Sequence, residues 1–153
     1  MKAKSLGLTL LLFFTAAVCV AQSPQMGTWK LNHDKSKFVP GATKNTTVIY
    51  EPAGDSVKII VKGTDRNGNA VHNEWTGKFD GMEYPVTGDP DSDARIYKQV
   101  NERTLDLTVK KGGTVTGRIK IVVSADGKTR TVTTSGRDAQ GKNFKNIAVY
   151  DKA

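Results

Sequence analysis

The 153-residue chain has only one cysteine, Cys19, and that residue lies in an apolar segment near the N-terminus. If this segment is removed, the remaining chain has no thiol. It can then form no disulfide and no zinc–thiolate site, and it has no cysteine nucleophile. These three kinds of site are therefore excluded for the mature chain.

Residues that commonly carry catalysis are also scarce. There are two histidines, His33 in an Asn-His-Asp sequence and His72, which alternation places on the polar face of its strand. No G-x-S-x-G sequence positions a serine nucleophile. The acidic segment 89–93 is followed by Ala94 and Val100 where a calcium-binding EF-hand loop needs glycine and glutamate. The sequence therefore favours a noncatalytic protein with no metal and no cofactor.

Positive charge is in excess but is not concentrated. The chain has 23 basic and 15 acidic residues, a formal net charge of +8. Without Lys2 and Lys4, 21 basic residues remain and the net charge is +6. The longest basic run is Lys110-Lys111, whereas nucleic-acid-binding proteins concentrate charge beside stacking aromatic residues. We expect no nucleic-acid partner, and at most a weak attraction to anionic polymers of the cell envelope.

A long hydrophobic run occurs once in the sequence, near the N-terminus. Lys2 and Lys4 precede the uncharged segment 6–21, which ends in Cys19-Val20-Ala21 with small residues at positions −3 and −1. This pattern predicts a signal peptide at residues 1–21 and a periplasmic or secreted protein. The run is shorter than the about 20 apolar residues of a membrane span, so no stable membrane insertion is expected after cleavage. A retained anchor or a lipoprotein is the alternative, although Val18 replaces the small residue that lipidation needs.

The rest of the chain, residues 22–153, has a period-two pattern. Val57, Ile59 and Val61 alternate with Lys58 and Lys62, which is typical of strands with one buried and one solvated face. Glycine-containing turn sequences separate such segments at short intervals. The pattern predicts nine or ten strands and no helix, at about residues 27–32, 45–51, 56–63, 70–79, 82–86, 94–100, 103–110, 114–124, 129–136 and 143–151. We expect one all-β domain, an antiparallel up-and-down barrel without open edges; a two-sheet sandwich would give much the same alternation.

Two ends of this domain resemble known families. Gly27-Thr28-Trp29 resembles the G-x-W motif of lipocalins, and the segment 143–152 resembles the last strand of fatty-acid-binding proteins. The chain thus resembles the calycin group over nearly all of residues 22–153. Segments 27–32, 80–81 with 84–90, and 124–128 resemble secreted bacterial proteins of an uncharacterised family. The resemblance implies a calycin-like barrel whose first-strand tryptophan plugs one end.

The last strand of this chain departs from the pattern of fatty-acid-binding proteins at one position. Fatty-acid-binding proteins typically hold a carboxylate with an R-x-Y pair on the last strand, and the matching positions here are Ala148 and Tyr150. Tyr150 can still donate a hydrogen bond, but the cation is missing at position 148. Lys98 is the candidate substitute, and its alternative position is at the rim of the barrel.

Side chains that alternation places inside the barrel are the candidate ligand contacts. They are Asn73, Trp75, Ile96, Lys98, Leu107, Ile121, Phe144, Asn146 and Tyr150. Asn73 and Asn146 end two copies of the pattern G-x-D-x-x-G-x-x-x-x-N and would be polar anchors, because buried amides need partners.

These observations predict noncatalytic binding or carriage of a small apolar or amphipathic ligand. The alternative is a protein- or polymer-binding module whose barrel is filled by its own side chains, and an enzyme is the third hypothesis. An interior cavity of several hundred Å³ would favour the carrier over the module.

Overall fold

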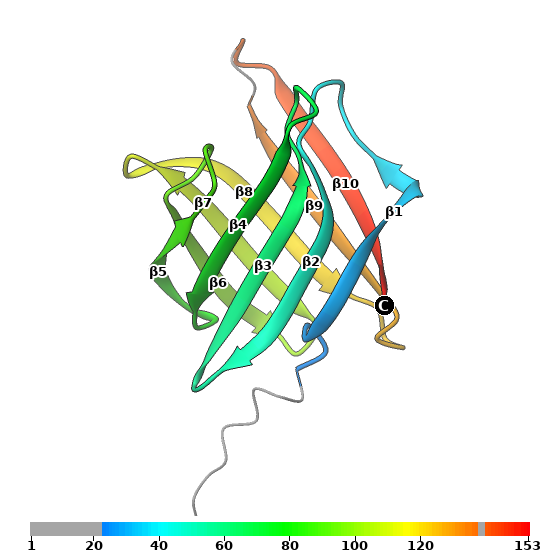
Figure 1. Ribbon diagram of the computed structural model, residues 1–153, viewed down its shortest axis with the longest axis vertical. Coiled ribbons are helices and arrows are strands. Elements are labelled where there is room, and N and C mark those ends of the chain that lie inside the picture. Colours follow the sequence, from blue (N-terminus) through cyan, green and yellow to red (C-terminus); the bar gives the residue numbers. More distant parts are fainter. Residues whose placement is uncertain (1–22, 138–139) are drawn as a thin grey trace, which may run out of the picture.

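The computed structural model describes residues 23–137 and 140–153, so the predicted signal peptide at residues 1–21 lies outside the described residues. Ten antiparallel strands close into one barrel in which β1 pairs with β10 (Figure 1). The strands are β1 (Gly27–Lys37), β2 (Lys44–Ala53), β3 (Ser56–Thr64), β4 (Ala70–Gly77), β5 (Asp80–Thr87), β6 (Ala94–Asn101), β7 (Thr104–Lys111), β8 (Thr114–Val123), β9 (Thr129–Arg137) and β10 (Asn143–Lys152). The predicted up-and-down barrel is confirmed, and the sandwich alternative is wrong because the sheet is closed.

Alternation explains why these segments form strands. In β3, Val57, Ile59 and Val61 are buried in the barrel, whereas Lys62 lies on the exposed side of the same strand. Burying each of these aliphatic side chains contributes about 1.5–3 kcal/mol to stability. Within the described part of the chain, no helix is long and apolar enough to cross a membrane.

The connections between strands define the two ends of the barrel. Because successive strands run in opposite directions, the β1–β2, β3–β4, β5–β6, β7–β8 and β9–β10 connections lie at one end (Figure 1). We call this the open end. The other connections and the segment 23–26 lie at the opposite, closed end.

Trp29 occupies the closed end. Its side chain is fully buried, and its Nε1 donates a hydrogen bond of 2.8 Å to the carbonyl oxygen of Gln25. Gln25 is itself buried and its Nε2 donates to the carbonyl oxygen of Arg103, 3.1 Å away in the β6–β7 connection. The segment before β1 therefore crosses the barrel and seals it, with the tryptophan as the plug.

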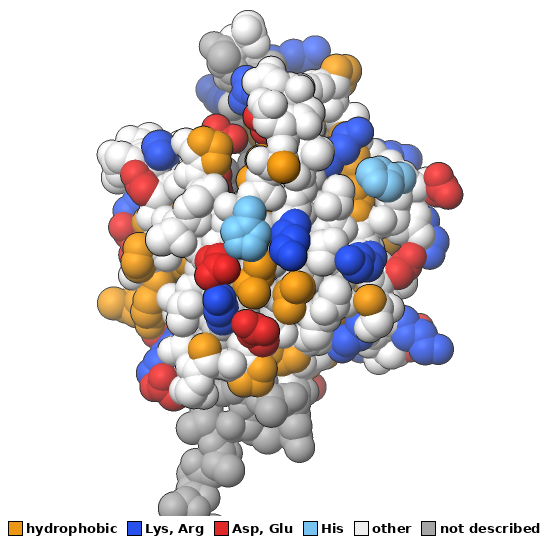
Figure 2. Space-filling model, viewed as in Figure 1, with side chains coloured by type: hydrophobic (Ala, Val, Ile, Leu, Met, Phe, Trp, Pro, Cys, Tyr) orange, Lys and Arg blue, Asp and Glu red, His pale blue; other side chains and the backbone are white. Residues whose placement is uncertain are grey.

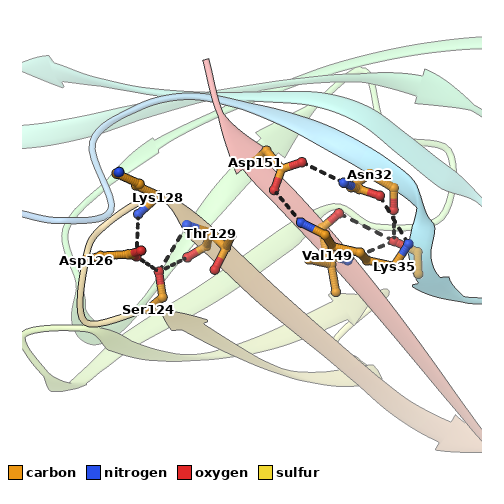
Figure 3. Close-up of polar contacts among 9 residues, drawn as sticks. Asn32, Lys35, Ser124, Asp126, Lys128, Thr129, Val149 and Asp151 are labelled. Atoms are coloured by element: carbon orange, nitrogen blue, oxygen red, sulfur yellow. Dashed lines mark hydrogen bonds and ion pairs between the residues drawn. The ribbon is translucent and has the colours of Figure 1, made fainter.

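Side chains join β1 to β10 where the strand pairing is irregular (Figure 3). The register shifts between Asn32 and Lys37. Asn32 Nδ2 donates a hydrogen bond of 2.6 Å to Asp151 Oδ2, and Ser36 Oγ accepts one of 2.9 Å from the backbone nitrogen of Val149. These bonds hold the seam of the barrel where the bulge interrupts the ladder. The same view shows the hydrogen bonds that brace the β8–β9 turn.

Candidate ligand-binding cavity

A cavity of about 1000 Å³ occupies the interior of the barrel. Its wall includes inward side chains of the strands and residues of four open-end connections, namely 38–43, Arg66, 89–91, and Gln140 with Lys142. The volume lies at the upper end of the range typical of small-molecule sites. A barrel filled by its own side chains would leave no such space.

Six of the nine predicted ligand contacts line this cavity. They are Asn73, Leu107, Ile121, Phe144, Asn146 and Tyr150. The alternation of β4, β7, β8 and β10 therefore identified the inward face of these strands, while contact with a ligand stays a prediction. Asn146 Oδ1 accepts a hydrogen bond of 2.8 Å from the backbone nitrogen of Val39 and so ties β10 to the β1–β2 connection.

Trp75 points inward as predicted, but it belongs to the core rather than to the cavity wall. Its ring stacks on Phe79 with a centroid distance of 6.3 Å, lies 4.5 Å from Tyr97 and meets Tyr84 edge to face. Its buried Nε1 has no hydrogen-bond partner among the described residues. Trp75 therefore packs the region where β4 and β5 share only two paired positions.

The predicted orientation of β6 is wrong. Lys98 is exposed and Ile96 is only partly buried, whereas Arg95 and Tyr97 are buried and line the cavity. The apolar residues Ile96 and Val100 suggested an inward face that is one residue out of phase. Lys98 therefore does not supply the missing cation.

The cation that alternation missed is Arg130, on β9. Its side chain is buried, and its guanidinium carbon lies 5.1, 4.9 and 5.0 Å from the ring centroids of Trp29, Tyr50 and Tyr150. Aromatic faces attract a guanidinium group, but they do not accept its hydrogen bonds as a carboxylate does. Its Nε and Nη1 have no hydrogen-bond partner within residues 23–137 and 140–153. Arg130 also lines the cavity, so it presents an uncompensated positive charge there.

Two neighbouring tyrosines do not neutralise this charge. Burial raises the pKa of Tyr150 to about 12, and burial also raises the pKa of Tyr97. Both phenols are therefore uncharged near neutral pH. Tyr150 Oη donates a hydrogen bond of 2.9 Å to the carbonyl oxygen of Asn45.

The second inward arginine, Arg95, has an acidic partner. Its Nη2 donates hydrogen bonds to Asp89 Oδ2 at 2.7 Å and to Asn73 Oδ1 at 2.9 Å. Ser92 Oγ also donates to Asp89 Oδ2, at 2.5 Å. Burial acts to raise the pKa of Asp89, but hydrogen bonds from Ser92, the backbone of Asp91 and Arg95 outweigh it and hold the pKa below its ordinary value. One buried arginine is thus neutralised and the other is not.

Neither histidine belongs to the wall of the cavity. His72 Nε2 lies 3.2 Å from Glu74 Oε1 on the outside of the barrel, and His33 is exposed on β1. In the described part of the chain, no group of three His, Cys, Asp or Glu residues could hold a metal ion. Acidic and basic side chains are interspersed over the outer face of β2, β3 and β4 (Figure 2).

Comparisons with protein-family models and with curated protein sequences find no match to this chain.

Proposed function

We propose that this protein is a noncatalytic carrier of a small amphipathic molecule that bears an anionic group. The observation that supports this proposal most directly is the buried Arg130, which lines a cavity of about 1000 Å³ with two nitrogen atoms unpartnered among the described residues. The signal-like segment 1–21 supports action in the periplasm or outside the cell.

The anionic group follows from the chemistry of the arginine. A guanidinium group always carries its charge and donates strong hydrogen bonds to carboxylates and phosphates. Removing one from water without an anionic partner is unfavourable, so a bound anion would compensate Arg130. The apolar part of the ligand follows from the neighbouring wall, where Leu107, Ile121 and Val132 offer aliphatic surface.

The alternatives receive less support. The cavity volume speaks against a module whose barrel is filled by its own side chains. An enzyme needs a nucleophile or base beside an orienting group, and the cavity wall contains neither histidine.

The direct test is native mass spectrometry of the mature protein purified gently from its own organism. We expect an extra mass of a few hundred daltons that disappears on denaturation, as expected for a drug-sized ligand in such a cavity. A bare mass, together with no binding of palmitate to the ligand-free protein, would contradict the proposal.

A matched pair of variants tests the role of the arginine. Arg130→Gln should weaken the binding of palmitate by about tenfold or more, since hydrogen bonds to charged groups contribute about 1.5–3 kcal/mol. Arg118→Gln removes the same charge from the exposed face of β8 and should leave binding within about twofold. Equal losses in the two variants would show that only overall charge matters.

A further inference from the structure

The cavity wall contains two buried arginines that differ in one respect. Arg95 is 7% exposed and Arg130 is 2% exposed. Arg95 forms an ion pair with Asp89, whereas no acidic side chain among the described residues pairs with Arg130. Of these two buried arginines, one is therefore compensated by an acidic side chain and the other is not, while the exposed Arg66, Arg137 and Lys142 add positive charge to the same wall.

The Asp89 carboxylate is fixed in place by its own loop. Its Oδ1 accepts a hydrogen bond of 2.9 Å from the backbone nitrogen of Asp91, and its Oδ2 accepts those of Ser92 and Arg95. The side chains of Arg95 and Asp89 are only 9% and 15% exposed. Asp89 lies in the β5–β6 connection at the open end and lines the cavity, so the carboxylate occupies Arg95 before a ligand arrives.

We propose that Asp89 determines ligand specificity: it occupies Arg95 and thereby leaves Arg130 as the one buried arginine of the cavity wall, among the described residues, that is available to an anionic group of the ligand. This inference rests on the proposed function. A second carboxylate that approached Arg95 would meet the negative charge of Asp89 in a poorly solvated space, where like charges repel strongly.

A purely structural role for Asp89 makes a different prediction. If the ion pair only held the β5–β6 connection in place, its removal would alter the affinity for every ligand to a similar degree. The specificity role requires that its removal favours ligands with two anionic groups. The ratio of the affinity for a ligand with two anionic groups to the affinity for a ligand with one therefore distinguishes the two roles.

The experiment compares palmitate with linear dicarboxylates from octanedioate to hexadecanedioate, by calorimetric titration of ligand-free protein. The wild-type protein should prefer palmitate over every dicarboxylate by about tenfold or more. In Asp89→Asn, the affinity for the dicarboxylate of best length should rise by about tenfold, while palmitate changes less than about threefold, because one new charge-assisted contact contributes on this scale.

Three further variants control this result. Asp106→Asn removes the same charge from an exposed ion pair with Lys120 and should leave the ratio unchanged. Arg95→Met added to Asp89→Asn should abolish the gain, because the second cation is then absent. If Asp89→Asn fails to fold, Ser92→Ala weakens the hold on the carboxylate and should shift the ratio in the same direction by a smaller factor.

The outcomes distinguish this inference from the proposed function. Binding of palmitate with an unchanged ratio in Asp89→Asn, or an equal shift in Asp106→Asn, overturns the inference alone. A rise in the affinity for both ligand classes assigns Asp89 a general electrostatic or structural role and also overturns it. If no variant and no wild-type protein binds any of these carboxylates, the proposed function itself fails.

Discussion

The guanidinium carbon of Arg130 lies 5.1 Å from the ring centroid of Trp29, the residue that plugs the closed end of the barrel. Lys152 Nζ lies 5.1 Å from the same centroid. The Trp29 ring therefore contacts two cations: Arg130, which lines the cavity, and Lys152, on the last strand. Sealing of the barrel and presentation of the buried charge depend on the same ring.

Because Arg130 is buried without an anionic partner among the described residues, we expect a variant that removes its charge to be more stable and to bind its ligand more weakly. We expect Arg130→Met to raise the free energy of unfolding of the ligand-free protein by about 1–2 kcal/mol, because replacing an uncompensated buried ion by an apolar side chain is often stabilising. The same variant should bind palmitate more weakly. Urea unfolding of protein freed of ligand measures the first effect. A loss of several kcal/mol would mean that the guanidinium is stabilised by more than the three aromatic rings.

Tyr150 makes the barrel sensitive to alkaline pH. Its pKa is raised by burial from about 10 in the unfolded chain to about 12 in the folded protein. The stability contributed by the neutral phenol is present below pH 10 and is lost as the pH rises toward 12. The loss amounts to about 2–3 kcal/mol for this one group.

Urea unfolding between pH 9 and pH 12 measures the slope with which the free energy of unfolding falls as the pH rises. Tyr150→Phe cannot ionise at this position and should reduce the slope, although it loses the hydrogen bond to Asn45 and about 1 kcal/mol at neutral pH. Tyr97, whose pKa is also raised by burial, should account for much of the remaining slope. An identical slope in wild-type protein and Tyr150→Phe would contradict the prediction.

The barrel could be predicted from the sequence because each strand has one solvated face. In β7, Leu105 and Leu107 are buried while Asp106 is exposed, so a period of two is visible without any knowledge of the partner strands. The same reasoning placed Leu107 and Ile121 on the cavity wall. Local alternation is therefore sufficient for the fold and for the apolar part of the site.

The charged part of the site could not be predicted in this way. Arg95 is buried because Asp89 and Asn73 meet it, and alternation of apolar residues cannot show that a charge has found partners. Arg130 depends on Trp29 and Tyr50, which lie far away in the sequence, on β1 and β2. The sequence does contain one indication: Arg130 lies two residues before Val132, so strand alternation places both side chains on the same face of β9.

Gly88 should be intolerant of any side chain. Its φ of +77° is unfavourable for other residues, and a Cβ there would lie 2.4 Å from the carbonyl oxygen of His72. We expect Gly88→Ala to lower the free energy of unfolding by at least about 2 kcal/mol, combining backbone strain with displacement of β4. Gly127 has a φ of +70°, and a Cβ added there would have no heavy atom within 4 Å apart from its own residue and the two residues next to it in the chain, so Gly127→Ala should lower the free energy of unfolding by only about 1 kcal/mol.

Thermal unfolding of the two alanine variants beside the wild-type protein tests this difference. Gly127→Ala carries the strain of positive φ alone, so the excess loss in Gly88→Ala reports the contact with β4. Equal losses in the two variants would show that the β5–β6 connection moves away from β4 without penalty.

Asp89 should also contribute to stability in a pH-dependent way. Because its pKa is lowered in the folded protein, its contribution is present above the unfolded value of about 3.9 and is lost as the pH falls through the folded value. At pH 7, Asp89→Asn leaves the buried Arg95 without its anion and should lower the free energy of unfolding by about 2–4 kcal/mol.

The difference between Asp89→Asn and wild-type protein should therefore shrink as the pH falls below about 4, because the Asp89 carboxyl of the unfolded chain becomes protonated there, whereas the folded carboxyl, with its lowered pKa, is protonated only at lower pH. Urea unfolding at pH 7 and at pH 3 measures it. The double variant with Arg95→Met should recover part of the stability at pH 7, because it removes the charge that Asp89 compensates. A constant difference across this pH range would show that Asp89 acts through its hydrogen bonds to Ser92 and the Asp91 backbone rather than through its charge.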